Sequence, residues 1–157
     1  MVTATFAYTF LLQTPSQVEQ LVMAVSQNSQ LRGQRRMWEP LLVPLVRARL
    51  FHFDGPALAR ILACMSCELR CIICSDRAIR RDLLPATRQA LLGCKQASHL
   101  RLLLEGMAGY TALHGGAMIG PKWRKAYRKQ AALLLTQASA SPEELQRVLQ
   151  AAEVLGL

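Results

Sequence analysis

The segment LARILACMS occupies residues 58–66, and three other segments of the chain repeat its pattern without gaps. They are VEQLVMAVS at 18–26, LRLLLEGMA at 100–108 and LQRVLQAAE at 145–153. The first residues of successive segments are separated by 40, 42 and 45 positions. Because a period of this size is typical of stacked helix pairs, the four segments predict the architecture of the whole chain.

Large apolar residues return at the first, fourth and fifth positions of each segment, a spacing that places them on one face of a helix. The seventh residue is always small, which allows two helix backbones to approach closely. Each segment is therefore predicted to be a helix packed tightly on its neighbours. The apolar positions are Val18, Leu21, Val22, Leu58, Ile61, Leu62, Leu100, Leu103, Leu104, Leu145, Val148 and Leu149, and the small ones are Ala24, Cys64, Gly106 and Ala151.

Helix-start signals precede three of the segments, at 14–16, 54–56 and 141–144. In the last, Ser141 is expected to cap the first turn and Glu144 to complete a capping box. A second amphipathic stretch follows each of the first three segments, at 38–50, 78–92 and 122–135. In the first of these stretches Pro40 fits a helix start, and Pro44 is expected to bend the helix or confine it to its later part.

These features predict an all-α protein, an α-solenoid of about three and a half repeats of 40–45 residues built from antiparallel helix pairs. The expected organisation is a single helical-repeat domain over 1–157. It divides into an N-terminal helix (1–13), repeats at 14–53, 54–96 and 97–140, and a terminal helix (141–157).

The repeat resembles that of the octotricopeptide-repeat family of organellar RNA-binding proteins. The segment SPEELQRVLQAAEVLGL at 141–157 is the most similar, and FDGPALARILACMSCEL, which ends at Leu69, comes next. Trp38 and Trp123 lie where this family often has a tryptophan in its second helix. The resemblance implies RNA binding and a mitochondrial location, with a mitochondrial ribosomal protein as one possibility.

The composition fits packed helices that contact an anionic partner. Apolar residues make up 52% of the 157 residues, and 19 Lys and Arg against 10 Asp and Glu give a net charge of +9. Such an excess favours contact with phosphate or with an acidic surface. No uninterrupted apolar run reaches the roughly 18 residues that a membrane-spanning helix needs. The opening 13 residues lack the basic flank and cleavage site of a signal peptide.

Most of the cations fall into three clusters, each in a connection and the second helix that follows it. We expect the repeat to align the clusters as a stripe that follows an RNA backbone. Trp123 and Tyr127 are four residues apart and would either stack on bases or anchor the core. Solvated helix faces, or an acidic protein or lipid partner, are the alternatives. The candidate RNA-binding residues are Arg35, Arg36, Arg77, Arg80, Arg81, Lys122, Trp123, Arg124, Lys125, Arg128 and Lys129, and the clusters also hold Arg32, Arg47, Arg49 and Arg88.

Four cysteines, Cys64, Cys67, Cys71 and Cys74, have a spacing that invites a zinc or iron–sulfur site. On a continuous helix they would lie in one narrow strip, which cannot enclose an ion. A break of the helix near residues 68–70, or ligands from a partner, would be needed. We therefore expect no metal, no other cofactor and no disulfide framework.

No catalytic pattern is present. The three histidines share no metal-ligand spacing, and the stretch at 115–122 lacks the Gly-Lys-Ser/Thr of a phosphate loop. The sequence therefore predicts a binding protein rather than an enzyme. The expected partners are structured RNA, namely rRNA, and neighbouring proteins of a large ribonucleoprotein assembly, and no small-molecule substrate is expected. The alternatives are a protein–protein scaffold in another organellar complex and an organellar RNA-maturation factor.

Overall fold

The computed structural model describes residues 14–71, 73–115, 118–137 and 140–157, and these residues form helices and connections without a strand. The prediction of an all-α protein is confirmed. The predicted helix over 1–13 lies outside the described residues. The α-helices are α2 (Pro15–Gln27), α3 (Ser29–Gly33), α4 (Arg35–Ala48), α5 (Gly55–Ala63), α6 (Asp76–Ala78), α7 (Leu84–Leu92), α8 (Ala97–His114), α9 (Pro121–Leu134) and α10 (Pro142–Val154), with π-helical turns η1 (Cys64–Glu68) and η2 (Ile79–Leu83).

The predicted helix starts are formed by the capping residues that the sequence offers. The side chains of Thr14, Asp54 and Ser141 each accept a hydrogen bond from a backbone N–H in the first turn of α2, α5 and α10. The capping box, however, is made by Thr14 with Gln17 at the start of α2. Glu144 pairs instead with Arg101, at 3.5 Å, because the packing of α10 on α8 places a guanidinium within its reach.

The predicted helix start at Pro40 was wrong, and Pro44 does not confine helix α4 to its later part. The helix begins at Arg35, ahead of Pro40, and continues through Pro44 to Ala48. Both prolines are exposed, so the carbonyls that lose their helical N–H partners lie on the solvent side of the helix, where water can satisfy them. Farther along the chain, Pro85 follows the π-helical turn η2. Pro85 has no N–H for an α-helical bond to the preceding turn, and the helix is widened just before it.

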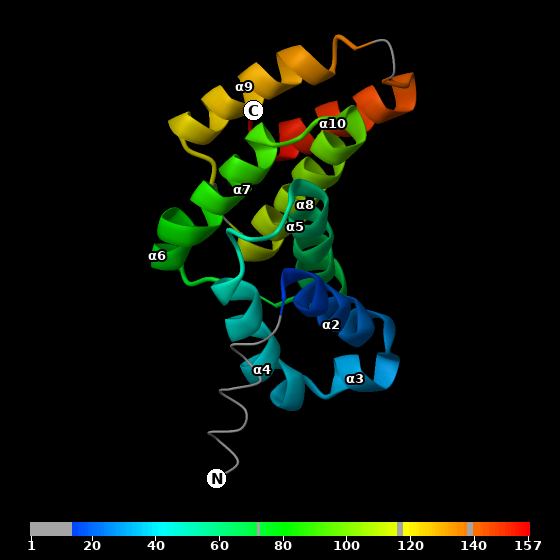
Figure 1. The fold of residues 1–157 in the computed structure, drawn as a ribbon, viewed down its shortest axis with the longest axis vertical. Helices are drawn as coiled ribbons and strands as arrows, with labels where there is room; N and C mark the ends of the chain where they lie inside the picture. The colour runs from blue at the N-terminus through cyan, green and yellow to red at the C-terminus, as the bar shows by residue number, and fades with distance from the viewer. Residues whose placement is uncertain (1–13, 72, 116–117, 138–139) are drawn as a thin grey trace.

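The helices lie in two rows along the long axis of the molecule (Figure 1). The first row is α2, α5, α8 and α10, in which α2 contacts α5, α5 contacts α8, and α8 contacts α10. The second row is α4, α7 and α9, in which α7 contacts α9. Contacts of α2 with α4, of α5 with α7 and of α8 with α9 join the rows. The four repeated segments thus form the first row and the intervening amphipathic stretches form the second.

The core follows the repeat most closely in the middle of the first row. All three apolar positions are fully buried in α5 and in α8. At the ends of the row, Leu21 of α2 is 39% exposed and Leu149 of α10 is 62% exposed. The small residue Ala24 is also exposed, contrary to the prediction. Among the described helices, α2 and α10 each have one neighbour within the first row, α5 and α8 respectively, and part of the repeated face of each is exposed.

The contact between α5 and α8 depends on a glycine. A Cβ atom on Gly106 would lie 2.9 Å from the carbonyl oxygen of Ala59 and 3.1 Å from Cβ of Leu62. Real Cβ atoms almost never approach a backbone atom so closely, so the two helices touch through backbone at this point. The small seventh position predicted from the sequence is therefore required in this pair of helices.

None of the described helices combines the length and the apolar character needed to cross a membrane.

Candidate nucleic-acid interface

The second row carries an open groove of about 460 Å³ between η2–α7 and the start of α9. Its walls include three cationic side chains, those of Arg80, Arg88 and Lys122. Its apolar lining comes from Leu84, Pro85, Pro121 and Trp123. Two of the three predicted basic clusters, separated by about forty residues in the chain, thus meet at one site.

The tertiary anchor of this site is Trp123. Its side chain is 2% exposed, and its indole N–H donates a hydrogen bond of 3.0 Å to Oγ1 of Thr87 on α7. Farther along α9, the side-chain amide of Gln130 donates to the carbonyl oxygen of Cys94, at 2.6 Å. Trp123 therefore holds α9 against α7, and its ring has too little open surface to be a base-stacking platform. Tyr127 is half-buried, and burial raises the pKa of its hydroxyl.

The outer face of α9 presents exposed cations. Lys122, Lys125, Arg128 and Lys129 are exposed and, among the residues that the structure describes, form no ion pair. Arg124 differs, because its guanidinium donates to the carbonyl oxygen of Gly156 and fastens the end of the chain to α9. Four of the five predicted cations of this helix are thus available to a ligand.

The basic cluster around η2 contains both paired and unpaired cations among the described residues. Arg77 and Arg80 are exposed and take no part in an ion pair with another described residue. Arg81 instead forms two hydrogen bonds with the neighbouring Asp82, at 3.0 and 2.9 Å, and these hold the pKa of the Asp82 carboxyl below its usual range. Arg47, near the end of α4, also lowers the pKa of Asp82 by its charge.

The cluster at the start of α4 does not join the groove. Arg35 pairs with Glu39 at 2.5 Å, and Arg32 pairs with Glu68 at 3.1 Å. Arg36 is exposed and lines a separate hollow that it shares with Arg35 and Glu39. The predicted stripe is therefore strongest over η2, α7 and α9, and weaker at the N-terminal end of the second row.

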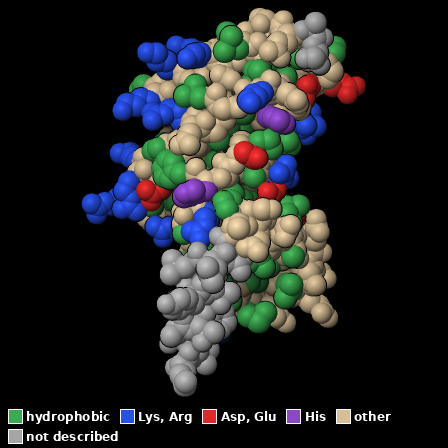
Figure 2. All heavy atoms as spheres, viewed as in Figure 1, with side chains coloured by type: hydrophobic (Ala, Val, Ile, Leu, Met, Phe, Trp, Pro, Cys, Tyr) green, Lys and Arg blue, Asp and Glu red, His purple; other side chains and the backbone are tan. Residues whose placement is uncertain are grey.

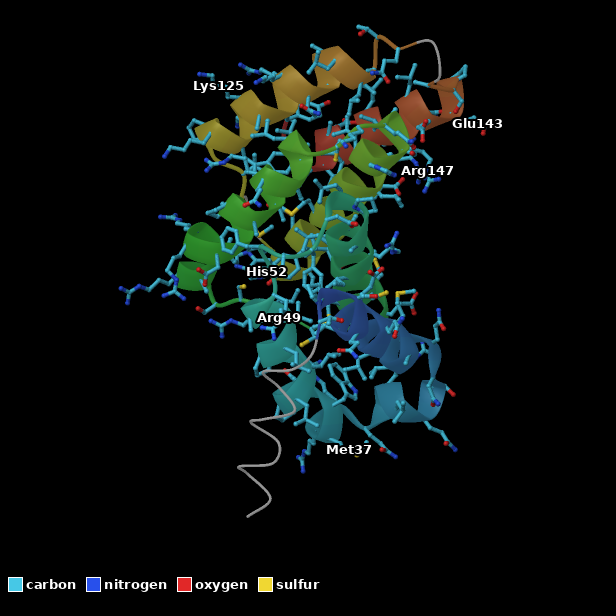
Figure 3. All side chains as sticks on the ribbon, viewed as in Figure 1. Met37, Arg49, His52, Lys125, Glu143 and Arg147 are labelled. Carbon is cyan, nitrogen blue, oxygen red and sulfur yellow. The ribbon has the colours of Figure 1, made fainter. Side chains whose placement is uncertain are left out.

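The acidic residues explain this distribution of charge. No Asp or Glu occurs between Asp82 and Glu105, or between Glu105 and Glu143, so neither α7 nor α9 contains one. In the first row, by contrast, Arg60 pairs with Glu19 across α5 and α2, and Arg147 pairs with Glu105 across α10 and α8. Figure 2 shows Lys and Arg gathered along the edge beside α6, α7 and α9. In Figure 3 Lys125 lies at that edge, and Arg147 and Glu143 lie at the opposite one.

The four clustered cysteines do not lie on one continuous helix, which was the premise of the prediction made for them. The helix does end after Glu68, and Arg70 adopts a left-handed φ of 48°, so Cys71 and Cys74 follow a break rather than continuing the strip of Cys64 and Cys67. Within the described residues, no three His, Cys, Asp or Glu side chains converge on a metal position. The thiols of Cys64 and Cys71 contact different parts of the fold. Cys64 contacts Met23, and Cys71 contacts Glu39.

Four of the five cysteines are buried and only Cys67 is exposed. Burial raises the pKa of the Cys71, Cys74 and Cys94 thiols to about 11 and that of Cys64 above its ordinary value. A raised thiol pKa means that the neutral form dominates near pH 7, so these four thiols are poor nucleophiles. All four belong to the hydrophobic core, where a thiol packs as a small apolar side chain.

Sequence reasoning missed the groove itself. It identified Arg80 and Lys122 as candidates, but not the apolar lining between them or the half-buried Arg88 as a member of the site. A signal was present in the two prolines, Pro85 and Pro121, which lie in the first turns of α7 and α9. Their proximity follows only from the packing of α7 on α9.

No protein-family model, curated protein or solved structure matches the chain.

Proposed function

We propose that the protein binds structured RNA through the cationic surface of its second row, and that its two rows of helices form a short α-solenoid. One observation carries the proposal. The exposed cations of α6, η2 and α9 have few carboxylates near them, and those of α9 have none as an ion-pair partner among the described residues. A surface that evolved for solubility alone is expected to mix both signs of charge, as the first row does.

Phosphates supply the complementary array. An RNA backbone carries a regular line of negative charge, and each phosphate neutralised by Lys or Arg releases condensed counterions. On α9 the exposed cations Lys122, Lys125 and Lys129 recur at intervals of three and four residues, and thus follow one face of the helix. Such a face fits backbone contact, which depends on the shape of the RNA and little on its base sequence.

We further propose that the chain is an embedded component of a larger ribonucleoprotein. Both ends of the helical stack expose large apolar side chains, with Met37 of α4 53% exposed and Leu149 and Val154 of α10 62% and 59% exposed. Apolar residues at the two ends fit neighbouring proteins better than water. The resemblance to octotricopeptide repeats supports ribosomal RNA of a mitochondrial ribosome as the ligand.

The test compares two double variants that remove the same charge from different rows. Lys125→Gln with Lys129→Gln should weaken binding to a structured RNA. The same variant should reduce the magnitude of the log–log salt slope by up to about 0.9 for each phosphate that it no longer neutralises. The matched control, Arg60→Gln with Arg147→Gln, lowers the net charge equally but lies in the first row, and should change neither quantity beyond the general effect of charge.

Fluorescence anisotropy across a salt series measures both affinity and slope, and thermal melting verifies that each variant is folded. Equal losses in the two double variants would mean that binding follows net charge alone, and the proposed interface would be wrong. Intact RNA binding in the second-row variant would also overturn it. Sedimentation of the native protein with ribosomal subunits on a gradient tests the assignment to a particle separately.

A further inference from the structure

The groove between η2–α7 and α9 combines a cationic rim with an apolar lining, and each part selects a different portion of a ligand. The cations Arg80, Arg88 and Lys122 come from two helical segments and line the same space. None of the three forms an ion pair within the described part of the chain, and no Asp or Glu lines the groove. The rim is thus suited to an anion with several acceptor oxygens, since Arg and Lys both bind phosphate.

Backbone groups add to the positive character of the rim. The N-cap of α9 is Gly120, which has no side chain to cap the helix, and the first helical residue is Pro121, which has no N–H. The backbone N–H of Arg124 bonds to the carbonyl oxygen of Gly120, so the N–H groups of Lys122 and Trp123 are the first-turn donors without a helical acceptor. Donors at a helix start favour a negative ligand beside the three cations.

The lining beneath these cations is mainly apolar. Leu84 and Pro85 contribute it from α7, and Pro121 and the small exposed part of Trp123 contribute it from α9. A free phosphate ion would gain nothing from this surface. A ligand with an anionic group joined to a flat, weakly polar ring would use both parts of the groove. At about 460 Å³ the groove has the dimensions of a small-molecule site, which lie at roughly 300–1,000 Å³, and it does not have those of a duplex.

We infer that this groove holds one unpaired nucleotide, with its phosphate among Arg80, Arg88 and Lys122 and its base against Leu84, Pro85 and Pro121. The inference rests on the proposed RNA binding and specifies it. The outer face of α9 contacts phosphates of the backbone, while the groove accepts a nucleotide turned out of a loop or bulge. Unstacked bases of this kind are the parts of RNA that proteins bind individually.

The two tryptophans provide a direct readout in the folded protein. Trp123 lines the groove, whereas Trp38 is a buried residue of α4 whose indole N–H faces the carbonyl oxygen of Arg32. Adenosine monophosphate titrated into ¹⁵N-labelled protein should shift the indole signal of Trp123 saturably and leave that of Trp38 unchanged. Adenosine lacks the charge-assisted contacts of the phosphate, and inorganic phosphate lacks the apolar contact of the base. Each should therefore bind at least about tenfold more weakly than adenosine monophosphate.

Variants identify the residues responsible. Arg88→Gln and Lys122→Gln should each weaken binding of adenosine monophosphate by about tenfold. Arg60→Gln removes the same charge from the first row and should leave the affinity unchanged. Melting curves that match the parent protein show that the losses come from the site. An unshifted Trp123 signal would overturn the inference, as would equal binding of inorganic phosphate, which indicates a plain anion site, or equal binding of an acidic peptide, which indicates a protein partner.

Failure of the inference and failure of the proposed function give different results. If the nucleotide does not reach Trp123 while the Lys125 and Lys129 double variant still weakens RNA binding, the groove is empty in the complex and the RNA-binding face stands. If RNA binding is indifferent to the double variant, the proposed function fails, whatever the nucleotide does. If the double variant and the groove variants each act as described, both proposals are supported by independent residues.

Discussion

The α5–α8 contact and the α7–α9 contact each join neighbouring helices of one row, and they are built by opposite means. α5 and α8 touch through backbone at Gly106, with no room for a Cβ atom. α7 and α9 are held by long side chains, in which Trp123 donates to Thr87 and Gln130 donates to a carbonyl oxygen. A glycine contact leaves no space between two helices, whereas a contact spaced by a tryptophan leaves a groove beside it.

The charges differ between the rows as strongly as the packing does. In the first row cations meet carboxylates across helix contacts. Arg101 of α8 pairs with Glu144 of α10 at 3.5 Å, in addition to its pair with Glu105 of its own helix at 3.2 Å. In the second row α7 and α9 contain no acidic residue. The lesson is that a cation is structural where the neighbouring helix supplies a carboxylate and is available for binding where it does not. Net charge alone does not separate the two cases.

Removing Trp123 should have the largest effect on stability. Trp123→Ala deletes a buried ring and leaves the Thr87 hydroxyl without its donor, so the free energy of unfolding should fall by about 3–5 kcal/mol. Urea denaturation measures the loss, with Lys122→Ala, an exposed neighbour on the same helix, as control. An unchanged unfolding midpoint together with lost RNA affinity would instead assign the ring to base stacking. Trp123 would then not be what holds α9 against α7.

Filling the glycine contact should come next. Gly106→Leu forces atoms into a space bounded by Ala59 and Leu62 and should destabilise the protein by about 1–3 kcal/mol through overpacking. The control is Gly33→Leu, because a Cβ atom on Gly33 has nothing within 4 Å. Equal melting temperatures for the two variants would show that α5 and α8 are not in backbone contact, and that the sequence repeat has been aligned in the wrong register.

Neutralising single cations should have the smallest effect and should sharpen the contrast in charge. Arg147 bonds to both carboxylate oxygens of Glu105, at 2.7 and 3.1 Å, so Arg147→Gln should cost up to about 1 kcal/mol, less at high salt. Lys125→Gln removes no ion pair and should leave the free energy of unfolding unchanged. Chemical denaturation at low and high salt measures both. A loss that is the same for the two variants would contradict the division between structural and available cations.

Much of the helical pattern was predictable because its signals are local. Thr14, Asp54 and Ser141 cap the first turns of their helices, and the predicted apolar spacing marks buried faces in α5 and α8. The errors arose where a local rule competes with position in the fold. Pro44 continues a helix because its face is solvent-exposed, and Ala24 is exposed because α2 is the outermost first-row helix of the part of the chain that the structure describes.

The candidate site also has features that could be predicted from the sequence and features that depend on the fold. The basic clusters and the lack of acids over two long stretches can be read directly from the chain, because charge is a property of residue type. Which cations are neutralised depends on distant residues, and Arg32 meets Glu68 only because two segments that are far apart in the chain fold together. For this reason the sequence could not show that Arg32 forms an ion pair whereas Arg80 forms none with another described residue.

The sequence by itself determined that this protein is helical, where its repeated segments lie and that it carries an excess of positive charge, since caps, periodicity and composition act over a few residues. The tertiary structure alone decided that Trp123 is buried against Thr87, that Arg80, Arg88 and Lys122 share one groove, and that the four clustered cysteines separate. Each of these outcomes depends on which helices pack together and at what spacing. Contact between distant segments is set by the packing of the whole core rather than by any one stretch of the chain.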